Sequence, residues 1–111
     1  MNMDMLTFSE KNGELTAKIS GELDHFLASD VRGRIDDMMA RKMPSALILD
    51  ISGVTFMDSS GLGLIMGRYT ACKSRGASFR LHGADSRAMK ILELAGLSGV
   101  IQTGSTAKGG V

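Results

Sequence analysis

An aspartate followed by two serines is the part of this sequence best suited to chemistry. Asp58, Ser59 and Ser60 come after an apolar segment and begin a stretch with helical spacing. The first N–H groups of a helix have no internal acceptor and carry partial positive charge, so they can hold a phosphate group. Aspartate and serine are also ordinary helix caps, and spacing alone favours capping. A serine here can therefore serve as a cap or as a switch.

Hydrolysis or nucleotide binding is a competing interpretation of the same segment. Ser60 would be the nucleophile, but the glycine that a nucleophile elbow needs two positions earlier is missing. Two scattered histidines do not indicate a catalytic triad. The spacing of Gly61, Leu62 and Gly63 is weak support for a nucleotide site. We therefore expect a protein that is not an enzyme.

Composition limits the remaining classes. The chain has 111 residues and is 43% hydrophobic, which predicts a single domain over 1–111 with a modest core. The only cysteine, Cys72, is expected to pack in the core, without a metal site. A net charge of +1 from scattered residues gives no support for nucleic-acid binding. No leader or membrane-spanning run stands out, so we expect a cytoplasmic protein that does not contact a membrane.

Apolar and polar residues alternate in several short segments, as in strands with one buried face. The dipeptide Asn12-Gly13 predicts a tight hairpin turn between the first two. Beyond the nearly continuous apolar run that ends at Leu49, residues 50–55 lead through Phe56 to the serines. The strands are expected at 6–9, 14–20, 46–49 and 78–82, with a last edge strand at 100–101.

Three segments have helical spacing. Asp24, Asp58 and either Asp85 or Ser86 stand where caps are expected. The first helix should bury Leu27, Val31, Ile35 and Met38, and the second should bury Leu62, Ile65, Met66, Tyr69 and Cys72. Gly61, Gly63 and Gly67 lower helix propensity in the second helix, which indicates close approach to the sheet or to a partner.

The order of these elements predicts the fold. Strands joined by helical crossovers should be parallel, and right-handed crossovers are the rule. Lys18 and Arg80 alternate with buried positions, so the face that they occupy cannot lie under helices. We expect an α/β fold with a mixed, mostly parallel sheet of about five strands and helices mainly on one face. The ordered core should span about 4–103, with a flexible tail at 104–111.

Three motifs resemble a known family. They are Gly21–His25 (GELDH), Phe56–Gly63 (FMDSSGLG) and Gly67–Tyr69 (GRY). The sequence from Leu6 to about Gln102 resembles the anti-sigma factor antagonists of the STAS domain family, especially the sporulation-type branch. The resemblance implies a β-α superhelix, in agreement with helices on one face.

The resemblance also implies a partner switch. The unphosphorylated protein would bind an anti-sigma factor that is a serine kinase, and so release a sigma factor. Phosphorylation by that kinase would end binding, and a PP2C-type serine phosphatase would restore it. Ser59 matches the family's phosphoacceptor, and Asp58 and Asp24 match positions near it.

The resemblance also bears on the partner-binding residues, on nucleotide binding and on an alternative function. Ser60, Gly61, Leu62 and Gly63 complete the expected partner-binding site. Weak purine nucleotide binding has been associated with this branch, but no phosphate loop in the sequence supports it and no cofactor is expected. The alternative function is a STAS scaffold, or a subunit of a transport complex, whose serine is never phosphorylated.

Overall fold

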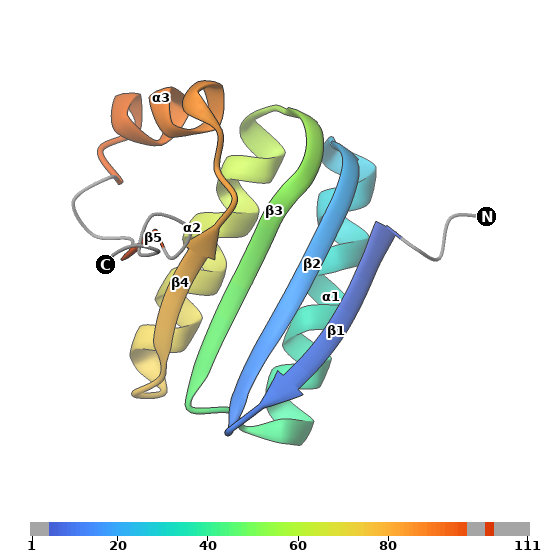
Figure 1. Ribbon diagram of the computed structural model, residues 1–111, viewed down its shortest axis with the longest axis vertical. Helices are drawn as coiled ribbons and strands as arrows, with labels where there is room; N and C mark the ends of the chain where they lie inside the picture. Colours follow the sequence, from blue (N-terminus) through green and yellow to red (C-terminus); the bar gives the residue numbers. More distant parts are fainter. Residues whose placement is uncertain (1–4, 98–101, 104–111) are drawn as a thin grey trace.

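The computed structural model describes residues 5–97 and 102–103. Its centre is a five-stranded sheet with strands in the order β1-β2-β3-β4-β5. Helices α1 and α2 lie together behind the sheet, and α3 lies beyond one end (Figure 1). The elements are β1 (Leu6–Lys11), β2 (Glu14–Leu23), α1 (His25–Lys42), β3 (Ala46–Met57), α2 (Ser59–Ser74), β4 (Ser78–His82), α3 (Ser86–Leu94) and β5 (Gln102–Thr103).

The predicted hairpin joins the only antiparallel pair among the described strands. β1 runs against β2, with Leu6 opposite Ile19. Asn12 and Gly13 have φ angles of 53° and 79°, the left-handed backbone that a two-residue turn needs and that asparagine and glycine tolerate. The remaining neighbours, β2 with β3, β3 with β4 and β4 with β5, are parallel, as the helical crossovers predicted.

β3 is longer than its apolar run indicated. The expected strand ended at Leu49, but β3 continues to Met57 because its second half still pairs with β2. The pairing with β4 stops at Asp50, so among the described strands this second half has a neighbour on one side only. Two register shifts accompany the extended pairing, one between Lys18 and Ser20 and one between Gly21 and Glu22. The irregular polarity of 50–56 therefore reflects a half-covered strand rather than a loop.

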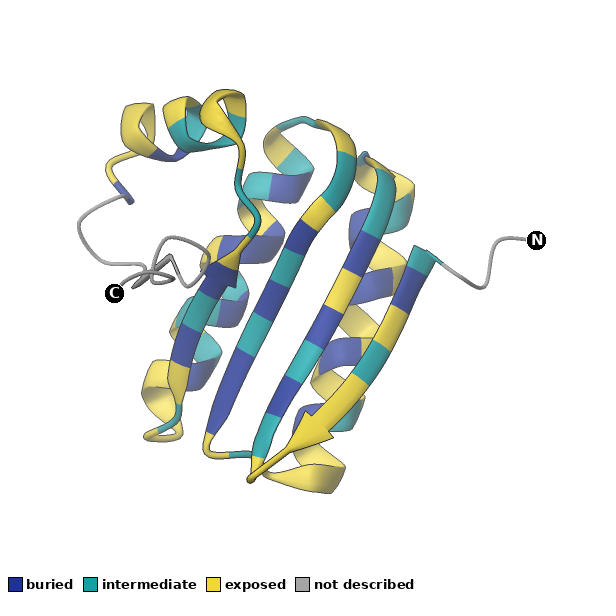
Figure 2. Ribbon diagram, in the orientation of Figure 1, coloured by how far each residue is buried: buried dark blue, intermediate teal, exposed yellow. Residues whose placement is uncertain are grey.

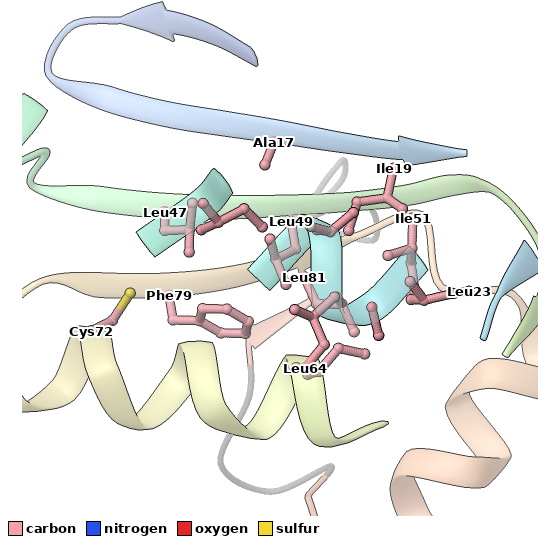
Figure 3. Close-up of a cluster of buried hydrophobic side chains, with 14 of the residues drawn as sticks. Ala17, Ile19, Leu23, Leu47, Leu49, Ile51, Leu64, Cys72, Phe79 and Leu81 are labelled. Atoms are coloured by element: carbon pink, nitrogen blue, oxygen red, sulfur yellow. The ribbon is translucent and has the colours of Figure 1, made fainter. Parts of the chain in front are cut away.

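The core fills the space between the sheet and the two long helices. Alternate residues of the central strands point into it, and Figure 2 shows the resulting bands of buried and exposed positions. Figure 3 shows the side chains that meet there, including Ala17, Ile19, Leu47, Leu49, Phe79 and Leu81. Each fully buried leucine or isoleucine contributes about 1.5–3 kcal/mol.

The other face of the sheet is polar and none of the described helices covers it, which confirms the one-sided arrangement (Figure 1). Lys18 is exposed on this face. Arg80 forms an ion pair with Glu14, with 2.8 Å between Nη2 and Oε1. The alternation of polar and apolar residues in β2 and β4 therefore predicted the side of the sheet that the helices occupy.

The buried face of α2 agrees with the prediction in part: Ile65 and Cys72 are buried, and Leu62 and Tyr69 are partly buried against the core, as expected. Gly61, Leu64, Ile65, Arg68 and Cys72 are its buried residues, whereas Met66 is 43% exposed. Apolar side chains surround most of this helix, so their spacing alone could not determine its rotation. In α1, likewise, Met39 is buried while its neighbour Met38 is only partly buried.

The last predicted elements are only partly within the described residues. β5 pairs with β4 at Arg80 and Leu81. The expected strand at 100–101 and the expected tail at 104–111 lie outside the described residues.

We predict opposite effects of alanine at two glycines of α2. A Cβ at Gly61 would overlap the Met57 side chain and lie 3.1 Å from Leu23, so Gly61→Ala should destabilise the fold by about 1–3 kcal/mol. No atom of the described residues lies within 4 Å of a Cβ built at Gly67, so Gly67→Ala should stabilise the fold by up to about 1 kcal/mol. Urea unfolding measures both, and equal effects would contradict the packing described for Gly61.

Candidate functional site

The register of two parallel strands brings the candidate aspartates to one edge of the sheet. Leu23 of β2 lies opposite Met57 of β3. Asp24 directly follows β2 and Asp58 directly follows β3. Both strands therefore end at the same level, and each is followed by an aspartate. The GELD and FMDSS motifs, remote in sequence, are therefore neighbours in space.

Each aspartate caps the helix that follows it. Asp24 Oδ1 accepts a hydrogen bond of 3.0 Å from the N–H of Leu27 at the start of α1. Asp58 Oδ1 accepts one of 2.8 Å from the N–H of Ser60 at the start of α2. Both have the extended backbone typical of an N-cap. The capping interpretation of these positions is confirmed, and it leaves a further role open.

The first turn of α2 is already well supplied with acceptors. Besides the Asp58 side chain, the Asp58 carbonyl oxygen accepts hydrogen bonds from Gly61 and Leu62, at 3.1 and 3.2 Å. Three of the first four N–H groups of α2, those of Ser60, Gly61 and Leu62, are thus engaged by Asp58.

The two serines differ in exposure. Ser59 is the first residue of α2 and is exposed, whereas Ser60 is partly buried. A partner enzyme could reach the Ser59 hydroxyl without opening the fold. Ser60 instead lines a hollow of about 300 Å³ between the N-terminal halves of α1 and α2.

That hollow has a mixed lining. Its walls include His25, Ser29 and Arg32 from α1, with Ser60 and Gly63 from α2. A Cβ at Gly63 would have no atom of the described residues within 4 Å, so within this part of the chain the glycine makes no close contact that requires its small size. Of the two explanations offered for the glycines of this helix, approach to the sheet therefore holds for Gly61 but not for Gly63 or Gly67.

Sequence reasoning missed one residue beside this site. Phe26, in the first turn of α1, is 82% exposed and contacts His25 edge to face, with 5.7 Å between the ring centroids. Phe56, at the end of β3, is 47% exposed. The signal that could have identified Phe26 is its position on the first turn of a helix, away from the apolar stripe of that helix.

The described residues do not assemble a catalytic triad. His25 lines the hollow with Ser60, but His82 lies with Lys11 and Arg80 on the open face of the sheet. Within 5–97 and 102–103, no three histidine, cysteine or acidic side chains are grouped closely enough to hold a metal ion. None of the described helices is both long and apolar enough to cross a membrane.

Comparison with known proteins agrees with this geometry. The STAS domain family model matches residues 6–109. The chain belongs to the STAS family. An anti-sigma F factor antagonist of Paenibacillus polymyxa is 32% identical over 97 residues, which cover 87% of this chain and 82% of that protein. The relationship places this STAS domain among the anti-sigma factor antagonists, as the three motifs indicated.

Solved structures share the fold. The anti-sigma factor antagonist SpoIIAA in its unphosphorylated form matches with a TM-score of 0.76 and 22% identity, over 88% of this chain and 86% of that one. The Bacillus cell fate determinant SpoIIAA in the phosphorylated form matches with a TM-score of 0.72 and 22% identity, over 88% and 89% of the two chains. Both matches support the STAS fold assigned from the motifs.

We predict that the two caps are each worth about 1 kcal/mol. Asp24→Ala and Asp58→Ala should each lower the free energy of unfolding by about 0.5–2 kcal/mol, because each leaves a helix N–H without its acceptor. Serine at either position retains an acceptor and should restore most of the loss. Asp37→Ala, which removes an exposed partner of Arg41 in α1, is the control. Equal losses in all three alanine variants would contradict the capping role.

Proposed function

We propose that this protein is an anti-sigma factor antagonist whose binding is switched off by phosphorylation of Ser59. The unmodified form binds an anti-sigma factor and thereby frees a sigma factor. The observation that carries the proposal is the exposed hydroxyl of Ser59, directly after the cap Asp58 and on the edge that Asp24 shares. The name of the P. polymyxa relative supports the same activity.

Ser59 is a better phosphoacceptor than Ser60 on structural grounds. Ser59 is exposed, whereas Ser60 is partly buried against the hollow between the helices. A kinase must bring the hydroxyl in line with the γ-phosphate of ATP, which requires open access on the protein side. The choice made from the family resemblance is therefore supported by a second, independent argument.

The switch acts through local charge. A phosphate adds about −1.5 to −2 charges and three acceptor oxygens. At Ser59 it would stand on an edge that already carries the carboxylates of Asp24 and Asp58. A partner surface complementary to the unmodified edge would then meet both repulsion and added bulk. The fold can stay as it is, and the match of both SpoIIAA forms to this same fold supports that view.

The proposed partners follow from this scheme. The anti-sigma factor is itself a serine kinase that uses ATP, and a PP2C-type serine phosphatase removes the phosphate. The protein acts in the cytoplasm as a binding module without catalysis of its own. Nucleotide belongs to the kinase, and weak purine nucleotide binding by this chain is a separate proposal that rests on family resemblance alone.

The alternative is a STAS scaffold, or a subunit of a transport complex, that keeps one constant partner. Phosphosite mapping by mass spectrometry separates the two functions, on protein isolated from its own cells in two growth states with its partners identified. The switch is supported if Ser59 carries phosphate and if the phosphorylated fraction falls in the growth state in which a kinase-type partner is bound. An unmodified Ser59 with the same partner in both states would favour the scaffold.

We predict that Ser59 variants separate binding from regulation. Ser59→Ala should bind the anti-sigma factor permanently, because no phosphate can be added. Ser59→Asp should bind at least about tenfold more weakly, equivalent to about 1.4 kcal/mol. Ser60→Ala is the matched control for regulation. It removes the neighbouring hydroxyl but keeps that of Ser59, so its binding should still be lost on phosphorylation. Equal affinities of Ser59→Ala and Ser59→Asp in a calorimetric titration would contradict the mechanism.

We also predict that Phe26 contributes to partner binding. Its side chain is 82% exposed, so Phe26→Ala should change stability little while weakening binding by about tenfold or more, as expected of an aromatic anchor. Met43 is 71% exposed at the other end of α1, so Met43→Ala is a control of similar exposure. Unchanged affinity in Phe26→Ala would place the interface elsewhere.

A further inference from the structure

A second hollow lies between α1 and α2, toward the ends of these helices that are remote from Ser59. Its volume is about 200 Å³, and it is lined by Asp36, Met39, Leu47, Arg68, Ala71, Cys72 and Arg75. These residues come from the C-terminal half of each helix and from the start of β3. None of them belongs to the candidate site around Ser59.

Arg68 brings a buried charge to this hollow. The residue is 9% exposed. Its Nε lies 3.1 Å from Asp36 Oδ1, an ion pair that connects α2 to α1. Asp36 is itself about half exposed, so water screens part of the charge that it offers. Among the described residues, Arg68 Nε and Nη1 are both buried without a hydrogen-bond acceptor, since the contact of Nε with Asp36 is an ion pair by distance only. Burying a cation with incomplete pairing is costly, so this arrangement is short of negative charge and of acceptors.

A second guanidinium lines the same hollow. Arg75, the C-cap residue of α2, donates a hydrogen bond of 3.1 Å from Nη2 to the carbonyl oxygen of Met39. This bond directs the side chain of Arg75, an exposed residue, toward α1. A guanidinium has five N–H donors, so one hydrogen bond leaves others that can reach another acceptor. The two arginines thus come from one helix but both reach toward the other.

Cys72, whose thiol is buried, lies within reach of both of these charges. Burial raises the pKa of Cys72, while the charges of Arg75 and Arg68 act in the opposite direction. Both guanidinium groups therefore favour negative charge at the buried cysteine, which forms part of the lining. The Asp36 carboxylate opposes an anion, but with two arginines against one carboxylate the charge of the lining stays positive.

We propose that this hollow binds a small oxyanion between the guanidinium groups of Arg68 and Arg75. The anion would bridge the two arginines by charge-assisted hydrogen bonds and would add negative charge beside the buried, incompletely paired Arg68 cation. Phosphate and carboxylate groups share this chemistry. Because one carboxylate already contacts Arg68, we expect weak binding, with a dissociation constant in the millimolar range. Such a ligand would strengthen the contact between α1 and α2.

An NMR titration of the isotope-labelled full chain tests this proposal. Inorganic phosphate and acetate are added in separate arms, with sodium chloride holding the ionic strength constant. Saturable shifts are expected at residues 36–39 and 68–75, with 24–27 and 58–60 unaffected. Saturation by phosphate alone would assign a tetrahedral anion, and saturation by acetate would extend the site to carboxylates. A third arm adds sodium chloride alone. Chemical shift changes that grow linearly without saturation, or that also appear in the sodium chloride arm, would overturn the proposal.

Variants of Arg75 connect the binding to the structure. Arg75→Gln should lower the affinity for the anion by at least about fivefold. Arg75→Lys should restore part of this affinity because lysine keeps the positive charge. Arg34→Gln is the matched control, since Arg34 is an exposed α1 arginine paired with Asp30 outside the hollow. Arg75 carries the test because loss of the buried Arg68 charge could unfold the chain. Equal affinity in Arg75→Gln and Arg34→Gln would also overturn the proposal.

Discussion

The parallel pairing of β2 with β3 is the constraint on which the candidate site depends. Leu23 opposite Met57 makes the two strands end together. Each strand then passes through one aspartate directly into a helix, so two helix N-termini and two carboxylates share an edge of the sheet. A shift of one residue in this register would separate them and would turn every side chain of a strand to the opposite face. Core packing and site geometry are therefore specified by the same pairing.

The position of α2 beneath that edge depends on Gly61. A side chain there would meet Met57 and Leu23, the last residues of β3 and β2. With hydrogen as its side chain, the first turn of α2 can pack directly against the strand ends. The first turn of α2 is therefore anchored on its inner side by Gly61. This anchoring fixes the backbone position of Ser59, although the Ser59 side chain itself is exposed.

Local patterns in the sequence predicted much of this structure because they report local physics. Alternation around Ala17 gave the buried face of β2, and caps act within three residues, so Asp24 and Asp58 could be recognised without tertiary information. The rotation of α2 and the burial of Arg68 depend on contacts with distant elements. Arg68 pairs with Asp36 of α1, and no feature near Arg68 in the sequence indicates that contact.

The engaged first turn of α2 also limits what a phosphate on Ser59 can do. Free N–H groups at a helix N-terminus would draw the phosphate onto the helix. Here Asp58 already occupies the N–H groups of Ser60, Gly61 and Leu62, through its carboxylate and its carbonyl oxygen. A phosphate would have to displace the Asp58 carboxylate from the Ser60 N–H, at a cost of about 1 kcal/mol, before it could bind that donor, and the bonds from Gly61 and Leu62 to the Asp58 carbonyl oxygen are part of the helix itself. If Ser59 is phosphorylated as proposed, the phosphate is therefore better accommodated facing outward, with the helix beneath it unchanged.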